Sequence, residues 1–303
     1  MKIIFMGTPK FAVPTLKSIY ESGHKILEVY TQPATKSGRG QKINHSDIFK
    51  CAKQLNLKIR SPDTLDDKEI NHIKKLKPDL VIVVAYGKIL PTKLLNVDKL
   101  IFINAHASLL PKWRGAAPIQ RAIMNMDIET GVSIMKIIPK LDAGPIMLQG
   151  KIKILQEMSF ENLSKKMSEM AANLILNAIK LIENNNAIYT EQKDLEATYA
   201  KKIQKNESKV NWNESAKKII AKINAFHPNP GCWFELSETR IKIVKAIEVE
   251  KSGKIGTIID NKMTIACSKN SVKILEIKKE GKKQMLVDDY LKGNKIRVGQ
   301  EVN

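Results

Sequence analysis

Apolar and polar positions divide the chain into two parts with different periodicities. Through about residue 185, short apolar runs alternate with longer stretches in which apolar residues recur every three or four positions. The short runs are typical of buried strands and the longer stretches of amphipathic helices. This alternation predicts an α/β fold, with a mostly parallel sheet covered by helices on both faces. The expected strands cover residues 2–6, 26–31, 80–85, 101–104, 131–136 and 146–154, and the expected helices cover residues 11–21, 67–76, 118–125 and 160–183.

The pattern changes after a polar stretch that follows the last of these helices. Residues 214–226 have the spacing of one amphipathic helix, and short β-type runs then follow at close intervals. Several short strands separated by Gly and Asn are typical of a small β-barrel. The expected organisation is an α/β domain at residues 1–188, a linker at 189–208 and a barrel at 209–303. The barrel strands are expected at residues 231–236, 240–248, 256–259, 263–267 and 272–278.

The strong positive charge of the chain indicates a polyanionic partner. The 303 residues carry a formal net charge of +20, and residues 201–303 alone hold 22 basic and 12 acidic groups. A lysine-rich surface gains affinity for polyanions by displacing their counterions, so a nucleic acid is an expected partner. Nucleotide bias in the coding sequence is the alternative explanation, because only six of the 51 basic residues are arginine.

Other features of the composition exclude several classes of protein. The chain has no apolar run of the ~18 to 20 residues that span a bilayer, and Gly7, Thr8 and Pro9 interrupt the first apolar run. We therefore expect a soluble, cytoplasmic protein. Its three cysteines are odd in number, far apart and outside metal spacing, so neither a disulfide framework nor a zinc site is indicated.

The segment NAHASLLPKWRGAAPIQR, residues 104–121, holds the strongest candidate for chemistry. Asn104 and His106 lie two residues apart at the end of an expected strand, so their side chains leave the same face. Asp142 lies in the turn KLDAGP, from which a carboxylate could reach the imidazole. An amide and a cationic imidazole can donate to an oxyanion, and the carboxylate would favour the charged imidazole. Together they predict acyl transfer, although His106 taken alone could be a core histidine.

Two apolar segments could form the walls of a binding slot. Ile89 and Leu90 follow the buried run VIVVAYGK, and Leu109 and Leu110 belong to the segment SLLP. A flat heterocycle bound at the strand ends would fit between them. The alternative is that these residues belong to the hydrophobic core.

The loop TQPATKSGRGQK, residues 31–42, carries Lys36, Arg39 and Lys42 between glycines and a serine. Such a loop can be a solvated connection. It can also be an arm that follows a nucleic-acid backbone with its cationic side chains. Because it follows the second strand, at the same sheet edge as His106, it could hold a large substrate over the site.

These residues resemble the formyltransferases that use 10-formyltetrahydrofolate. Asn104, His106 and Asp142, with SLLP at 108–111 and RGAAPIQR at 114–121, resemble the active-site signature of that family. The opening FMGTPKFAVPTL, the loop TQP…GRG, VVAYGKILP and ETGVSIM are similar to the members that act on methionyl-tRNA. The resemblance covers essentially the whole chain.

The resemblance implies both a fold and a reaction. The fold is a Rossmann-like catalytic domain followed by an OB-like barrel that binds tRNA. The reaction is formylation of the α-amine of methionine on initiator tRNA, which leaves tetrahydrofolate. In this family the pterin ring lies beside the SLLP loop, so the resemblance implies folate contacts at Ser108, Leu109, Leu110 and Pro111. The scheme requires no metal and no membrane, and we expect a monomer.

Three other functions remain alternatives on the sequence. A formyltransferase acting on a small amine would share the site but would need neither the basic barrel nor the GRG loop. A nucleic-acid-binding protein without catalysis would leave Asn104, His106 and Asp142 without a purpose. A nicotinamide-dependent oxidoreductase is disfavoured because the opening strand and Gly7-Thr8-Pro9 lack the GxGxxG fingerprint.

Overall fold

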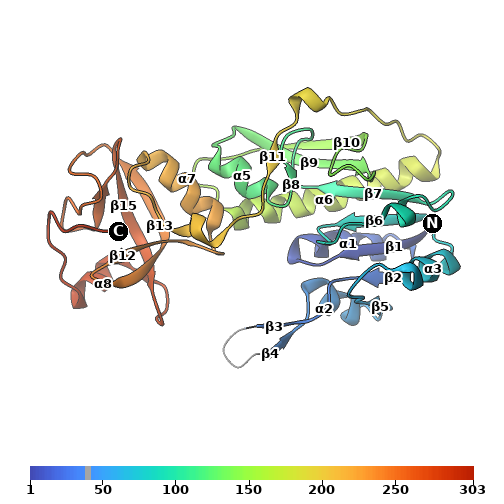
Figure 1. The fold of residues 1–303 in the computed structure, drawn as a ribbon, viewed down its shortest axis with the longest axis horizontal. Coiled ribbons are helices and arrows are strands. Elements are labelled where there is room, and N and C mark those ends of the chain that lie inside the picture. The colour runs from blue at the N-terminus through green and yellow to red at the C-terminus, as the bar shows by residue number, and fades with distance from the viewer. Residues whose placement is uncertain (38–41) are drawn as a thin grey trace. The chain divides into compact units, whose positions relative to one another are not determined.

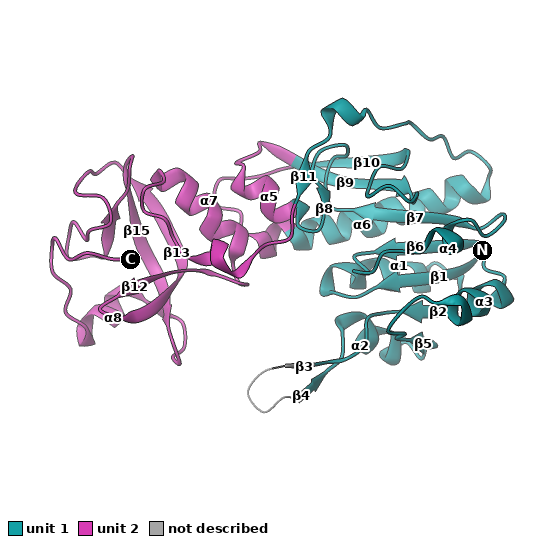
Figure 2. Ribbon diagram, in the orientation of Figure 1, with its two compact units in different colours: residues 1–118, 130–152, 164–200 teal, residues 119–129, 153–163, 201–303 magenta. Residues whose placement is uncertain are grey.

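The computed structural model describes residues 1–37 and 42–303, and it consists of two compact units (Figures 1 and 2). Unit 1 contains most of the first 200 residues, and unit 2 contains the last third of the chain and two short earlier segments. Unit 1 comprises residues 1–118, 130–152 and 164–200, and unit 2 comprises residues 119–129, 153–163 and 201–303.

Unit 1 is built on a seven-stranded sheet with the order β10-β9-β7-β6-β1-β2-β5. Strand β1 lies between β2 and β6 and pairs with both in parallel. The pairs β2–β5 and β6–β7 are also parallel, whereas β7 and β9 are antiparallel. The prediction of a mostly parallel sheet is therefore confirmed. The strands are β1 (Lys2–Gly7), β2 (Lys25–Tyr30), β5 (Ile59–Arg60), β6 (Leu80–Val84), β7 (Ile101–His106), β9 (Glu129–Lys136) and β10 (Ile146–Lys153).

The central strand β1 is buried on both faces of the sheet. Alternate residues of β1 point to opposite sides, and all four of Ile3, Ile4, Phe5 and Met6 are fully buried. Ile4 and Met6 pack in a cluster with residues of β6 and of helix α3 (Asp67–Leu76), so Ile3 and Phe5 face the other layer. The continuous apolar strands of the sequence are explained by this double coverage.

Two helices of unit 1, α2 (Asp47–Gln54) and α3 (Asp67–Leu76), begin after a capping side chain. Ser46 Oγ accepts from the Phe49 N–H at the start of α2, and the Asp66 carboxylate accepts from the Glu69 N–H at the start of α3. Helices α2 and α4 were not predicted, because eight and four residues are too short to show a clear period. The helical elements before residue 200 are η1 (Lys10–Ala12), α1 (Val13–Glu21), α2 (Asp47–Gln54), α3 (Asp67–Leu76), α4 (Thr92–Leu95), α5 (Pro118–Met124), α6 (Phe160–Glu183) and η2 (Asp194–Glu196).

Two short strand pairs stand outside the large sheet. Strands β3 (Thr35–Ser37) and β4 (Lys42–Asn44) form an antiparallel hairpin from the basic loop. Strands β8 (Arg114–Gly115) and β11 (Tyr199–Ala200) pair in parallel. The second pair brings residues from the expected linker against the segment that follows His106.

Unit 2 contains an antiparallel sheet with the order β12-β13-β15-β14, and β16 pairs with β15. Beyond β14, Ala266 N–H donates to the Thr257 carbonyl and Val302 N–H to that of Gly256. Asn303 and Glu235 of β12 then exchange two backbone hydrogen bonds, at 3.1 and 2.6 Å. These bonds close the ring, as expected of a barrel. The elements are η3 (Lys205–Ser208), α7 (Ala216–Phe226), β12 (Cys232–Leu236), β13 (Thr239–Val249), β14 (Thr264–Ala266), β15 (Ser271–Lys279), β16 (Met285–Leu286) and α8 (Val287–Gly293).

One of the expected barrel strands, residues 256–259, pairs with its neighbours only through isolated bridges. Residues 256–259 make isolated bridges, Thr257 to Glu301 and Ile258 to Ile265, and no continuous strand. They nevertheless occupy the place in the ring that the pattern assigned to a strand. In the described part of the chain, no helix combines the length and the apolar character needed to cross a membrane.

Candidate active site

The candidate site lies where β7 ends at the carboxyl edge of the sheet in unit 1. Asn104 and His106 share one face of β7, and in the ladder His106 stands opposite Ser133 of β9. The His106 side chain is 6 % exposed, so its polar atoms need partners within the protein. Open α/β sheets commonly bind their ligands beyond this edge.

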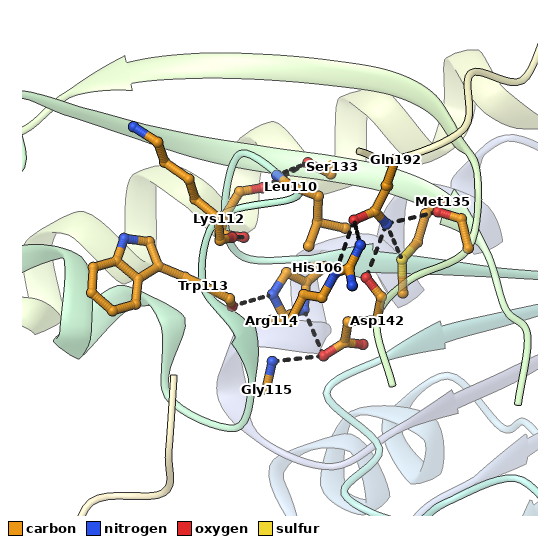
Figure 3. A network of polar contacts seen from close by, with 12 residues as sticks. His106, Leu110, Lys112, Trp113, Arg114, Gly115, Ser133, Met135, Asp142 and Gln192 are labelled. Carbon is orange, nitrogen blue, oxygen red and sulfur yellow. Dashed lines mark hydrogen bonds and ion pairs between the residues drawn. The ribbon is translucent and has the colours of Figure 1, made fainter. Parts of the chain in front are cut away.

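The imidazole of His106 has a polar partner at each nitrogen (Figure 3). Its Nε2 lies 2.9 Å from the carbonyl oxygen of Trp113, and a carbonyl can only accept, so Nε2 carries the proton. Its Nδ1 lies 3.6 Å from Oδ2 of Asp142. The sequence prediction that Asp142 faces His106 therefore describes the geometry that the fold produces.

Asp142 has an unusual backbone conformation, and its carboxylate accepts a hydrogen bond from the backbone. Its φ of +45° is a left-handed conformation that Asp adopts more readily than most residues. Its Oδ2 accepts a 2.8 Å hydrogen bond from the N–H of Gly115, the residue that follows the buried Arg114. The same oxygen faces Nδ1 of His106. The carboxylate is thereby held between the Gly115 N–H and the imidazole.

Gln192 ties the Asp142 turn to Arg114. Its amide nitrogen donates to the carbonyl oxygens of Asp142, at 2.9 Å, and Gly144, at 2.7 Å. Its oxygen accepts from Nε and Nη2 of Arg114, at 3.1 and 2.9 Å. Figure 3 shows Gln192 between the guanidinium and the Asp142 turn. All four hydrogen-bonding positions of the amide are used.

The Arg114 side chain is 1 % exposed, and it forms an ion pair with the more exposed carboxylate of Asp194. Its Nη1 donates to Oδ1 of Asp194 at 2.8 Å, and Lys140 donates to the other oxygen of the same carboxylate. Hydrogen bonds from Lys140 and then from Arg114 lower the pKa of Asp194 below its usual value. The buried guanidinium is thus neutralised by a carboxylate that stays ionised.

A second set of hydrogen bonds fixes the segment Ser108–Pro111. Ser133 Oγ donates to the Ser108 carbonyl at 2.7 Å and accepts from the Leu110 N–H at 3.0 Å. Gln149 Nε2 donates to the Leu110 carbonyl at 3.0 Å and to Ser133 Oγ at 2.8 Å. Both backbone groups of Leu110 are therefore occupied. Within the described residues the Leu109 N–H makes no hydrogen bond.

The other predicted site residues differ in their surroundings. Leu90 and Leu110 are buried, and Leu90 belongs to the core cluster on one face of the sheet. Ile89 is 90 % exposed, whereas Leu109 and Pro111 are half-buried. A common slot formed by all of them stays a prediction.

The structure describes two of the three predicted cationic residues of the basic loop. Lys36 lies in β3 and Lys42 in β4, and Arg39 lies outside the described residues. Their role in binding stays a prediction. Among residues 1–37 and 42–303, no group of three or more His, Cys, Asp or Glu side chains could hold a metal ion.

Three residues of this network had no assigned role in the sequence. Ser133 had a usable signal, because a polar residue in the buried run GVSIM needs a hydrogen-bond partner. Arg114 is part of the motif RGAAPIQR, which gives it no individual role. Gln192 lies in a polar stretch that resembles a solvated connection, and no periodicity distinguishes it.

Comparisons with known proteins agree with this fold. Residues 1–179 match the model of formyl transferase, and residues 202–295 match that of the formyl transferase C-terminal domain. An N-formyltransferase from Helicobacter canadensis, solved with folinic acid and dTDP-3-aminofucose, has a TM-score of 0.70 at 21 % identity. The match covers 90 % of this chain and 99 % of that one. HypX from Aquifex aeolicus, solved with tetrahydrofolic acid, has a TM-score of 0.65 at 17 % identity, over 98 % of this chain and about half (50 %) of its own length.

The α/β sheet, the closed barrel and both family matches define an enzyme that transfers formyl groups: the chain belongs to the formyltransferase family. A full-length relative places it more narrowly. The methionyl-tRNA formyltransferase of Pelagibacter ubique is 49 % identical over 304 residues, which cover 99 % of this chain and 98 % of the relative.

Proposed function

We propose that this chain transfers the formyl group of 10-formyltetrahydrofolate to the α-amine of methionine on initiator tRNA. The observation that carries the chemistry is the Asp142 carboxylate, which lies 3.6 Å from the His106 imidazole at the carboxyl edge of the sheet. The substrate is supported by the full-length similarity to methionyl-tRNA formyltransferases. The products are N-formylmethionyl-tRNA and tetrahydrofolate.

Catalysis begins when the uncharged amine attacks the formyl carbon, so that negative charge develops on the formyl oxygen. Asn104 is the first donor, because its side-chain amide makes no hydrogen bond within the described residues. His106 is the second donor, through its Nε2–H, which the Trp113 carbonyl also accepts. Removal of one oxyanion donor typically lowers the rate ~100- to 1000-fold.

The amine must also lose a proton, and the leaving nitrogen of the folate must gain one. The Asp142 carboxylate, 3.6 Å from His106 Nδ1, can accept one proton and pass it on to another reacting group. Asp142 takes the amine proton as the new C–N bond forms. The same proton then moves to the folate nitrogen as the old C–N bond breaks.

The folate donor is proposed to lie against the segment Ser108–Pro111. The backbone of Leu110 is already bound to Ser133 and Gln149, which fixes the segment. The Leu109 N–H and the half-buried side chains of Leu109 and Pro111 remain for the pterin ring. The predicted contacts of Ile89 and Leu90 would complete this site. No step requires a metal ion.

The tRNA is proposed to contact the basic barrel and the basic loop with Lys36, Arg39 and Lys42. In unit 2, Arg240 stacks on the Trp233 ring at 3.8 Å and Lys209 lies 5.4 Å from the ring centroid. These cations next to an aromatic ring are typical of nucleic-acid surfaces. The domain limits at 188 and 208, a monomeric state and a cytoplasmic location stay predictions.

Formylation is tested with purified protein, labelled formyl donor, methionyl-tRNA and glycinamide ribonucleotide in one mixture. We expect the label on methionyl-tRNA. Label on the ribonucleotide alone would contradict the proposed substrate. Asp142→Asn is expected to keep tRNA and folate affinity while kcat falls at least ~100-fold. Asp63→Asn, at an exposed carboxylate of unit 1, is the matched control.

A further inference from the structure

Beyond the residues that touch the reacting groups, we infer that Gln192 is a positioning residue for Asp142. The inference rests on the proposed function, because it assigns Gln192 a role only through the carboxylate that handles the proton. Gln192 lies in the polar segment before η2, far from the site in sequence. Its amide nevertheless makes two hydrogen bonds to the turn that presents Asp142.

The turn needs this support because its backbone is unusual. Asp142 has φ +45°, and a Cβ on Gly144, two residues later, would lie 1.8 Å from the Lys136 carbonyl oxygen. The turn is therefore packed closely against β9 on one side. On the other side, the Gln192 N–H groups occupy the Asp142 and Gly144 carbonyls, which fixes the direction of the Asp142 side chain.

Gln192 is itself held by a charged group that solvent does not reach. Arg114 donates two hydrogen bonds to the Gln192 oxygen, which orients the amide so that its nitrogen faces the turn. The adjacent Gly115 N–H donates to Asp142 Oδ2. Arg114 and Gly115 thus hold Asp142 from two directions, through Gln192 at its carbonyl and directly at its carboxylate. Loss of Gln192 removes one of these two connections.

The expected consequence is a loss of rate with little change in affinity. Gln192→Met keeps the size of the side chain and removes its hydrogen bonds. We expect kcat for methionyl-tRNA formylation to fall about 10- to 100-fold, since a displacement of about 1 Å can have an effect of this size. The KM values for methionyl-tRNA and folate should stay within about twofold. Gln54→Met, at an exposed glutamine of α2, is the matched control.

Two further measurements separate positioning from general destabilisation. Exchange of the Gly115 amide should accelerate about 10-fold in Gln192→Met, because its acceptor Asp142 Oδ2 moves, while amides of β7 stay protected. In an Asp142→Asn background, Gln192→Met should change kcat less than about twofold, because its effect passes through the carboxylate. If Gln192→Met does not fold, Gln192→Glu, which keeps an acceptor for Arg114, is measured in the same way.

The outcomes are distinguishable. A kcat within twofold of wild type, or an equal loss of kcat with and without the Asp142 carboxylate, would overturn the positioning role. Wild-type protein that does not formylate methionyl-tRNA would overturn the proposed function instead, and Gly115 exchange would still report whether Gln192 holds the turn. Unchanged Gly115 exchange in the folded variant would also overturn the inference.

Discussion

The hydroxyl of Ser133 offers a sharp test of how the segment Ser108–Pro111 is held. Ser133→Ala removes only one oxygen, and it leaves the packing of the buried strand unchanged. That oxygen donates to the Ser108 carbonyl and accepts from Leu110 N–H and Gln149 Nε2. Ser133 and Ser108 are fully buried and Leu110 is 4 % exposed, so water cannot readily replace the lost partner.

The magnitude follows from the groups that lose a partner. In Ser133→Ala, the Leu110 N–H and the Ser108 carbonyl lose this bond, whereas Gln149 keeps its bond to the Leu110 carbonyl. An unsatisfied buried polar group typically costs about 1–3 kcal/mol. Two such groups predict a decrease of about 2–6 kcal/mol in the free energy of unfolding of unit 1. The loosened segment should also raise the KM for 10-formyltetrahydrofolate about 10-fold, with a smaller effect on tRNA.

Hydrogen exchange of the amides in β7 and β9, followed by mass spectrometry, measures the stability of unit 1 within the whole chain. Ser168→Ala is the matched control: Ser168 is 5 % exposed, but its hydroxyl donates only to the Lys165 carbonyl within the same helix. We expect the control to lose less than about 1 kcal/mol. If both variants lost the same stability and the folate KM of Ser133→Ala were unchanged, the reasoning would be refuted.

Other predictions concern acid stability, strand packing and salt. Burial alone would raise the pKa of Asp260, but hydrogen bonds from Thr264, Lys251 and backbone N–H groups lower it to about 2. The stability that this carboxylate adds is present above its unfolded pKa of 3.8 and is lost as the pH falls toward 2. After solvent screening, Asp260→Asn should lose about 1 kcal/mol at pH 7 and progressively less below pH 4 in urea titrations; a pH-independent loss would contradict this. Gly131→Ala would place a Cβ 1.9 Å from the Gly150 carbonyl oxygen, so we expect a loss of about 3 kcal/mol or more, against almost none for Gly293→Ala. Affinity for methionyl-tRNA should fall steeply between 50 and 200 mM salt while folate affinity hardly changes, in filter-binding and calorimetric titrations; salt-independent tRNA binding would argue against the basic surface.

Most strands and helices of unit 1 could be predicted from the sequence, because each has either a short apolar run or a helical spacing of apolar residues. Helix α3 begins at Asp67 and ends at Leu76, as its spacing predicts, because a capping Asp precedes an amphipathic run. The barrel was also readable from its short runs, although residues 256–259 pair only through isolated bridges. The very short strands β8 and β11 had no signal, since two residues cannot show a period and their pairing depends on distant segments.

The sequence by itself determined the sheet, the barrel, the net charge and the residue types of the candidate site. Periodicity reflects which side of an element is buried, and this is a local property of the chain. Only the tertiary structure decided that Gly115 is the second partner of Asp142, and that Gln192 connects Arg114 to the Asp142 turn. These contacts join loops that are far apart along the chain. Hydrogen bonds between such loops depend on angles and distances that the folded sheet sets, so no pattern of neighbouring residues records them.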